Sequence, residues 1–118
     1  MVKQSTAALD DTFTALADPT RRAILARLAG GAVSMGDLAQ PFEMSWPAIT
    51  KHVKVLERAG LVRREQDGRL HRIHLDAAPL RDVRDFVDNY RQFWEAGFDR
   101  LDTYLRERGH TRRKKRQR

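Results

Sequence analysis

The fold of this chain is decided by one stretch, Ser45-Trp46-Pro47-Ala48-Ile49-Thr50-Lys51-His52-Val53-Lys54-Val55-Leu56-Glu57-Arg58-Ala59-Gly60, which predicts a short helix with clear ends. The hydroxyl of Ser45 can accept a hydrogen bond from a free amide of the first turn, as N-cap residues do. Pro47 is tolerated in that turn, where its missing N–H removes no helical bond. Gly60 follows the last periodic residue and suits a left-handed C-terminal cap. The sequence itself therefore bounds this helix at both ends.

The two faces of the predicted helix differ in chemistry. At about 100° per residue, Ile49, Val53 and Leu56 form one apolar stripe, which predicts burial against a core. The opposite side is polar and cationic, and it comprises Pro47, Thr50, Lys51, Lys54 and Arg58, with Trp46 on its flank. Such a face suits a polyanion with readable edges, which means duplex DNA. The alternative is a solvated basic face on an ordinary core helix.

The charge of the chain is unevenly distributed. The formal net charge is +7, and the tail 112–118 carries six positive charges and no negative one. Residues 45–75 hold seven Lys or Arg against three Asp or Glu, whereas residues 1–44 hold four against five. Positive charge concentrated around one helix is the electrostatic footprint of a small DNA-binding module.

Length and composition bound the class of protein. With 118 residues the chain can form one domain with a modest core. It contains no Cys, which excludes disulfides and thiolate metal sites. Residues 1–11 lack the apolar segment of a signal peptide, and no apolar run approaches membrane-spanning length. We therefore expect a cytoplasmic, nucleoid-associated protein with no membrane partner and no cofactor.

Shorter helices are predicted before the central one. The first spans residues 7–17, after a frayed start at 1–6. The second has Asp18 as its N-cap, and Ser34 can cap a third, short helix. The third helix and the central helix are joined by so few residues that they read as a helix-turn-helix, whose second helix enters the major groove. The predicted core positions of the second and third helices are Ile24, Leu25, Leu28, Leu38 and Ala39.

After Gly60 the hydrophobic period changes from 3.6 to 2. The runs 61–66 and 70–75 flank Asp67-Gly68, which predicts a hairpin whose two central residues both take φ > 0. A basic hairpin directly after such a helix is a wing that can reach the phosphate backbone or the minor groove. The alternative is a solvated edge hairpin whose charges oppose aggregation. The hairpin arginines are Arg69 at the tip, with Arg63, Arg64 and Arg72 behind it, and its inward residues are Ile73 and Leu75.

The C-terminal part predicts one long helix from Pro79 to about Arg108, with apolar positions at spacings of three and four. So much apolar surface on one helix implies a partner, and the simplest partner is the same helix of a second copy, together with the first helix. The alternative is a monomer that folds this helix back on its own core. The predicted domain is 1–108, and a basic, disordered tail follows at 109–118. The predicted dimer interface comprises Leu9, Phe13, Val87, Tyr90, Trp94, Phe98 and Leu101.

The order of these parts resembles the ArsR (arsenic repressor) family of bacterial transcriptional regulators. Residues 13–25, the stretch Asp37-Leu38-Ala39 and residues 45–62 carry the resemblance, which covers about residues 10–76. The resemblance implies a mainly α fold with a small β-hairpin wing, a winged helix-turn-helix that dimerises through its first and last helices. The aromatic last helix, with Tyr90-Arg91-Gln92-Phe93-Trp94, is similar to a metal-independent branch of the family.

The chain departs from the metal sensors of that family. Those sensors place thiols on the first helix of the helix-turn-helix, where this chain has residues 34–39 without a thiol. A second family metal site uses Asp and His on the last helix, but Asp82 is followed by Arg84 where a His would be needed. Because His71 and His74 are an odd number of residues apart on a strand, they face opposite sides. We therefore expect no metal site, and we expect His52 to be a packed, hydrogen-bonded residue.

The expected function is that of a homodimeric regulator, a repressor that binds a (pseudo)palindromic operator in double-stranded DNA. Helix 45–59 would enter the major groove, and the 61–75 hairpin would lie on the backbone or in the minor groove. No catalytic set of residues is evident, so we expect no enzyme. The alternative function is a winged-helix protein-interaction module without specific DNA readout. The predicted DNA contacts are Ser45, Lys51, Lys54, Arg69 and Arg72 to phosphates and Trp46, Pro47 and Thr50 to base edges.

A small-molecule effector of unknown identity is a further partner that the sequence allows. It would occupy a pocket at the dimer interface, lined by an aromatic cluster, although such a cluster is more often simply core. The cluster comprises Phe86, Tyr90, Phe93, Trp94 and Phe98.

Overall fold

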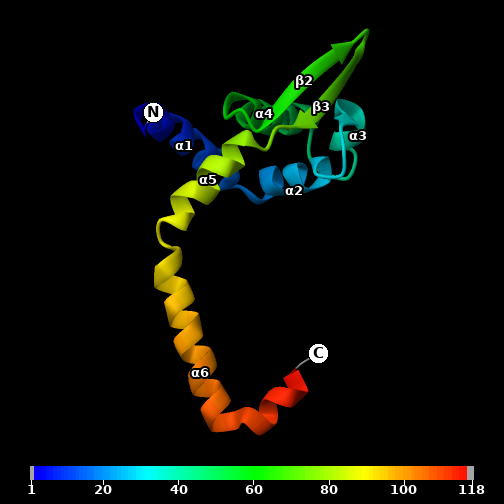
Figure 1. The fold of residues 1–118 in the computed structure, drawn as a ribbon. Helices are drawn as coiled ribbons and strands as arrows, with labels where there is room; N and C mark the ends of the chain where they lie inside the picture. The colour runs from blue at the N-terminus through cyan, green and yellow to red at the C-terminus, as the bar shows by residue number, and fades with distance from the viewer. Residues whose placement is uncertain (1, 117–118) are drawn as a thin grey trace. The chain divides into compact units, whose positions relative to one another are not determined.

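The structure, a computed structural model, describes the backbone of residues 2–116 and the side chains of residues 6–95, 97 and 100–108. Within these residues the fold is mainly helical with a small antiparallel sheet, as predicted (Figure 1). The chain forms two compact units, Met1–Arg84 and Asp85–Arg118. The elements are α1 (Val2–Leu16), α2 (Pro19–Leu28), β1 (Val33–Ser34), α3 (Met35–Ala39), α4 (Trp46–Arg58), β2 (Val62–Asp67), β3 (Leu70–Leu75), α5 (Ala78–Asp88) and α6 (Arg91–Arg116).

The first two helices meet at Asp18. Helix α1 begins at Val2, earlier than the predicted start at Ala7, and no Pro or Gly interrupts it. Asp18 has extended backbone angles, and its Oδ2 accepts a hydrogen bond from the backbone N–H of Arg21 at 3.0 Å. Pro19 is the first residue of α2, where its missing N–H removes no helical bond, and the predicted cap at Asp18 is confirmed.

Helices α3 and α4 form the predicted helix-turn-helix. Ser34 caps α3, because its Oγ accepts from the backbone N–H of Asp37 at 3.2 Å. Ser45 caps α4 in the same way, and its Oγ accepts from the backbone N–H of Ala48 at 3.2 Å. The short connection 40–45 leaves the two helices adjacent in the chain, with α4 as the second helix of the motif.

Helix α4 ends in a Schellman motif. Gly60 has a φ of +78°, and its N–H donates to the carbonyl of Glu57 at 3.0 Å. The N–H of Leu61 donates to the carbonyl of Leu56 at 3.0 Å, so two carbonyls of the last turn are satisfied. The side chains of Leu56 and Leu61 are both fully buried, which supplies the hydrophobic contact of this motif. The predicted left-handed cap at Gly60 is confirmed.

The sheet has three strands in the order β1-β3-β2, and all of its pairings are antiparallel. The sequence predicted only the hairpin of β2 and β3. Strand β1 is two residues long, pairing Val33 with Ile73 and Ser34 with Arg72. A strand this short carries no alternating pattern of its own, so it exists because β3 offers a free edge for pairing.

The hairpin turn differs from the predicted one. Asp67 pairs with Leu70, so the two central residues of the turn are Gly68 and Arg69. Gly68 has a φ of +67°, whereas no non-glycine residue in the described chain has a positive φ. Glycine at the first central position is what a type II′ turn requires, so the expectation of two positive φ angles at Asp67-Gly68 is wrong. The register of the strands decides which residues occupy the turn.

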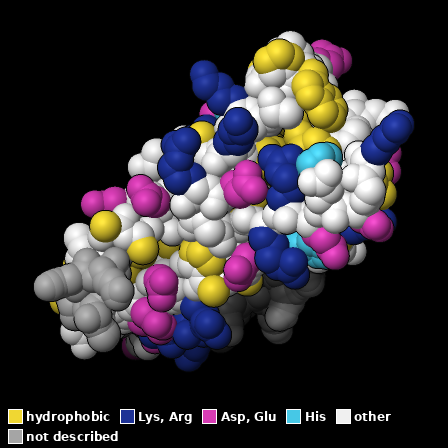
Figure 2. Space-filling model, turned by 90° about the horizontal axis from the view of Figure 1, so that it is seen from above, with side chains coloured by type: hydrophobic (Ala, Val, Ile, Leu, Met, Phe, Trp, Pro, Cys, Tyr) yellow, Lys and Arg dark blue, Asp and Glu magenta, His cyan; other side chains and the backbone are white. Residues whose placement is uncertain are grey.

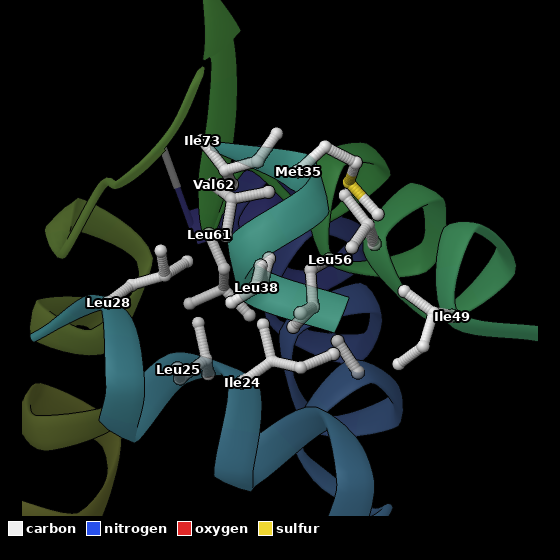
Figure 3. Packing of buried hydrophobic residues seen from close by; sticks show 12 residues of the cluster. Ile24, Leu25, Leu28, Met35, Leu38, Ile49, Leu56, Leu61, Val62 and Ile73 are labelled. Carbon is white, nitrogen blue, oxygen red and sulfur yellow. The ribbon is translucent and has the colours of Figure 1, made fainter. Parts of the chain in front are cut away.

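One hydrophobic core joins the helices to the sheet in the unit of residues 1–84 (Figure 3). In Figure 3, Ile24 and Leu25 of α2, Leu38 of α3 and Leu56 of α4 converge on a common centre. The predicted core positions of α2 and α4 are all buried, and Ala39 of α3 packs against the core with partial burial. The core residues are Ala15, Ile24, Leu25, Leu28, Met35, Leu38, Ile49, Val53, Leu56, Leu61, Val62 and Ile73.

The prediction of a single long C-terminal helix is wrong, because the chain forms two helices there. Helix α5 ends at Asp88 and α6 begins at Arg91. At the break, the N–H of Asn89 donates to Phe86 at 3.2 Å and the N–H of Tyr90 donates to Val87 at 2.9 Å. These i→i−3 bonds replace the α-helical ones, and Asn favours such turns because its side chain competes for backbone groups.

Helix α6 extends to Arg116 and so includes most of the tail that the sequence predicts to be irregular. Residues 117 and 118 lie outside the described residues. No helix of the described chain is both long enough and apolar enough to cross a membrane.

Candidate nucleic-acid interface

Helix α4 presents its polar face on the surface of the unit of residues 1–84. Ser45, Pro47, Lys51 and Lys54 are exposed, and the side chain of Trp46 is 54% exposed. The opposite stripe of α4 is fully buried, so the polar face cannot turn inward without breaking the core. The exposed face therefore carries five of the six residues that were predicted to contact DNA from this helix, and the sixth, Thr50, is half-buried.

Thr50 uses its hydroxyl within α4. Its Oγ1 donates toward the carbonyls of Trp46 and Pro47, both at 3.0 Å. Because the hydroxyl proton is engaged by the backbone, Thr50 has no hydroxyl donor for a base, whereas its methyl group remains available for an apolar contact. This favours contact of Thr50 with a thymine methyl group over a hydrogen bond that Thr50 donates to a base edge.

The N-terminal half of α4 and the tip of the wing border the same hollow. Its volume is about 340 Å³. Trp46 and Thr50 line it from α4, while Arg69 comes from the turn between β2 and β3. The structure thus brings together three of the predicted DNA contacts that are far apart in sequence. The complete lining comprises Met35, Gly36, Trp46, Thr50, Arg64, Arg69, Leu70 and His71.

Arg64 belongs to this hollow and was missed as a site residue. It pairs with Ile73 in the sheet, and its Nη2 lies 3.4 Å from Glu57 Oε1. The sequence could have identified Arg64, because side chains alternate between the two faces of a strand. Arg64 is two residues from the buried Val62 and so lies on the same face. Arg64 therefore adds a positive charge between α4 and the wing, partly balanced by Glu57.

Arg72 lies on the other face of the wing. It pairs with Glu65 on β2, and alternation places it opposite the buried Ile73. On that face, His74 Nε2 lies 2.7 Å from Glu65 Oε1, and this hydrogen bond lowers the pKa of Glu65 below its ordinary value. Arg72 is therefore separated from the hollow, and a phosphate contact through it would use the outer face of the wing.

The histidines are arranged as the sequence predicted. His71 lines the hollow and His74 bonds Glu65, so the two lie on opposite faces of β3. His52 is packed, with a side chain that is 20% exposed, and its Nδ1 lies 3.2 Å from Nη1 of Arg21. Within the described residues, no group of three or more His, Asp or Glu side chains could hold a metal ion.

On the face seen in Figure 2, basic side chains are spread out and do not form one block. Figure 2 views the molecule from the side toward which the wing points in Figure 1, and it shows Lys and Arg side chains interspersed with Asp and Glu. A mixed surface of this kind supplies phosphate contacts at separate points, so register on a duplex would depend on which basic residues meet phosphates.

The predicted dimer residues are largely exposed. On α1, Phe13 is 37% exposed, and Leu9 is half-buried. In the unit of residues 85–118, Tyr90 is 49%, Trp94 38% and Leu101 50% exposed. Val87 is exposed as well, and the side chain of Phe98 lies outside the described residues. Large apolar side chains exposed along a helix are typical of a surface that another chain covers.

Comparison with known proteins identifies the family. Residues 16–65 match the helix-turn-helix domain family. The chain is 41% identical over 85 residues to the HTH-type transcriptional regulator Rv2034 of Mycobacterium tuberculosis, which covers 72% of this chain and 77% of that protein. It is 33% identical over 82 residues to the transcriptional repressor SdpR of Bacillus subtilis, covering 70% of this chain and 91% of that repressor.

Solved structures agree with these relatives. A crystal structure of an ArsR family transcriptional regulator is similar with a TM-score of 0.71 and 37% identity, covering 76% of this chain and 93% of that one. An ArsR-like transcriptional regulator from Rhodococcus sp. RHA1 has a TM-score of 0.67 and 29% identity, covering 86% of this chain and 95% of its own. These relatives are transcriptional regulators and not enzymes. The chain belongs to the ArsR family of helix-turn-helix transcriptional regulators.

Proposed function

We propose that the protein is a homodimeric repressor that reads a (pseudo)palindromic DNA operator. Helix α4 lies in the major groove, and the wing formed by β2 and β3 lies on the backbone or in the minor groove. The observation that carries this proposal is the hollow where Trp46 and Thr50 of α4 meet Arg69 of the wing. The indole of Trp46 and the methyl group of Thr50 suit apolar contacts with bases, and the guanidinium of Arg69 suits the phosphates that flank those bases.

The contacts divide into two classes. Ser45, Lys51, Lys54, Arg69 and Arg72 hold phosphates, whereas Trp46, Pro47 and Thr50 meet base edges. The hydroxyl of Ser45 can donate to a phosphate while its oxygen continues to accept from Ala48, since a hydroxyl both donates and accepts. The phosphate contacts set affinity and register, and the base contacts set sequence preference.

A dimer is the functional unit in this proposal. The apolar residues of α1 and of the C-terminal helices are covered by the same residues of a second copy, which removes them from water. Residues 1–108 then act as the DNA-binding and dimerisation domain, and the basic residues after 108 add non-specific phosphate contacts. The protein works on the nucleoid in the cytoplasm. Metal does not control it, because the thiols of the family's metal sensors are absent from residues 34–39.

A selection from a random DNA library with the purified full-length chain tests the proposal. We expect enrichment of a two-fold symmetric site whose half-sites lie about one helical turn, or a multiple of it, apart. Affinity for the selected duplex should be steep in salt, since about six to eight phosphates neutralised by a dimer imply a loss of roughly a thousandfold between low and moderate salt. Lys54→Ala should weaken all sequences alike, whereas Thr50→Ala should change the preferred sequence.

The competing function is a winged-helix module that binds a protein and does not read DNA. It would show no enriched sequence and a flat salt dependence with duplex DNA. The polar face of α4 carries no Asp or Glu at positions 46, 47, 50, 51 or 54, which favours a polyanionic partner.

A further inference from the structure

We propose that Arg21 is a positioning residue for DNA recognition, because it fixes the rotation of α4 through His52. The proposal rests on the proposed function, since it assigns to Arg21 the orientation of the helix that reads DNA. Arg21 itself lies at the start of α2 and has no predicted contact with DNA.

The guanidinium of Arg21 joins three elements. Its Nε donates to the carbonyl of Ala15 at 2.7 Å, and its Nη2 donates to the carbonyl of Thr14 at 3.0 Å. Both carbonyls belong to the last turn of α1. Its Nη1 lies 3.2 Å from Nδ1 of His52 on α4. The backbone N–H of the same residue donates to Asp18 Oδ2 at 3.0 Å, so the start of α2 is held at the same point.

The end of α1 explains why an arginine is needed here. The last carbonyls of a helix have no partner within the helix, and α1 has no glycine after Leu16 to close them in a left-handed cap. The N–H of Ala17 bonds the carbonyl of Thr14 at 3.2 Å, and arginines of α2 supply the remaining donors, since Arg22 Nη1 also donates to the carbonyl of Leu16 at 2.8 Å. A cation is further favoured at this negative end of the helix dipole. Arg21 differs from Arg22 in that it reaches onward to α4.

The contact with His52 restricts a small roll of α4 that apolar packing resists less specifically. Ile49, Val53 and Leu56 hold α4 along one buried stripe, and apolar contacts have little directional preference. His52 lies beside that stripe, where a hydrogen bond resists a roll of the helix about its own axis. A small roll would shift Trp46 and Thr50 relative to the wing while the apolar stripe stays in the core. A directional bond at His52 therefore selects the orientation that places both residues at the hollow.

The contact with Arg21 also determines which nitrogen of the His52 ring carries the proton. A guanidinium can only donate, so Nδ1 must be the bare nitrogen and the proton must be on Nε2. A protonated ring would direct an N–H at the guanidinium and would turn toward Asp18 Oδ2, which lies 3.8 Å from Nδ1. The bond from Arg21 thus requires neutral His52 with its proton on Nε2.

The bond also connects recognition to assembly. Thr14 and Ala15, which anchor the guanidinium, follow Leu9 and Phe13 on α1, the residues predicted to meet the second copy. A repressor dimer must present its two α4 helices at a set spacing to reach adjacent major grooves. Arg21 ties the orientation of α4 to the helix that carries part of the predicted dimer surface, so the spacing and the rotation of α4 are set together.

Binding of the selected operator duplex, measured by fluorescence anisotropy, tests the proposal. Arg21→Gln should weaken binding about tenfold, because α4 would occupy the binding orientation only about a tenth of the time. His52→Leu should weaken binding to a similar degree, and the double variant should be no weaker than the weaker single variant, as expected for two residues of one bond. His52→Asn, whose side-chain oxygen can replace Nδ1 as the acceptor, should bind within about threefold of the wild type.

Arg22→Gln is the matched control. It removes the same charge and one bond to the end of α1, and among the described residues no hydrogen bond or ion pair is seen between Arg22 and α4. It should change operator affinity by less than about threefold, because salt screens most of the attraction between one distant charge and DNA. Equal losses for Arg21→Gln and Arg22→Gln, or losses for Arg21→Gln and His52→Leu that multiply in the double variant, would overturn the proposal.

Nitrogen-15 NMR of the histidine rings gives a readout that needs no DNA. In the wild type, the spectrum should show His52 with a bare Nδ1 at pH about 8, and Arg21→Gln should shift that resonance whereas Arg22→Gln should not. A proton on Nδ1 would overturn the proposal even if Arg21→Gln failed to fold. A wild-type chain that enriches no DNA sequence would refute the proposed function, and the ring spectra would still decide whether Arg21 holds α4.

Discussion

Substitution of Gly60 by Ala should destabilise the unit of residues 1–84 by about 1–2 kcal/mol, the cost of placing an L-residue in the left-handed region. Gly60 has a φ of +78° at the junction between α4 and the wing. The new methyl group would meet Pro79 Cγ at 3.6 Å, which is an ordinary van der Waals contact, so no clash adds to the backbone cost. The loss should therefore be limited to backbone strain.

Thermal and urea unfolding followed by circular dichroism would measure the loss, with all variants at one protein concentration because a dimer's stability depends on it. For a domain of this size, each 1 kcal/mol lowers Tm by roughly 4–8 °C, and the urea m-value should be unchanged. Gly60→Asn should lose less, since Asn tolerates this region. Gly36→Ala is the matched control: its φ is not positive and its added methyl group meets no atom within 4 Å, so it should be neutral or stabilising by up to about 1 kcal/mol.

Wild-type stability in Gly60→Ala would refute the strain argument. A loss above about 4 kcal/mol would refute the claim that no clash occurs, because losses of that size require a packing or burial defect.

Further perturbations test other parts of the structure. Thr50→Val keeps the methyl group and should retain the sequence preference of the wild type, whereas Thr50→Ser should weaken that preference by about 1 kcal/mol at one base pair. Anisotropy on single-base variants of the operator measures the preference, and the reverse order of the two variants would contradict readout through the methyl group. Trp94→Asp should give monomer or aggregate in sedimentation and abolish operator binding, because two charges in an apolar interface face several kcal/mol of desolvation; a monomer with undiminished affinity would exclude the proposed dimer. The hydrogen bond from the backbone N–H of Arg21 lowers the pKa of Asp18 below its ordinary value of 3.8, so the stability that ionised Asp18 contributes should be complete above pH 3.8 and lost as pH falls through the lowered value. Asp18→Asn keeps the cap without the titration, and its urea midpoint should approach or exceed that of the wild type in that acid range; a difference that is constant with pH would contradict this assignment. Zinc, cadmium or arsenite at micromolar concentration should not release a preformed complex, and stoichiometric release would disprove the proposed metal independence.

The starts of α2, α3 and α4 and the end of α4 were determined by the sequence alone, because each depends on groups a few residues apart. Asp18, Ser34 and Ser45 cap their helices through an oxygen that bonds an amide three residues later. Gly60 closes α4 through bonds to the preceding turn. The apolar spacing of α2 and α4 likewise identified the core, since helical periodicity places those residues on one side before any tertiary contact forms. The helix-turn-helix and the family followed from these local features.

Tertiary structure decided the features that depend on partners distant in the chain. Strand β1 exists because β3 accepts it, and the register of β2 on β3 puts Gly68-Arg69 in the turn and Arg64 beside Trp46. The break between α5 and α6 depends on turn bonds that compete closely with helical ones, so a heptad pattern could not exclude it. Arg21 and His52 are 31 residues apart, and only the packing of α1, α2 and α4 brings them within a hydrogen bond. Local sequence could therefore specify the caps of α2, α3 and α4, because each cap is a contact between near neighbours in the chain. The position of one helix against another depends on contacts between residues that are distant in the chain, which residue spacing does not encode.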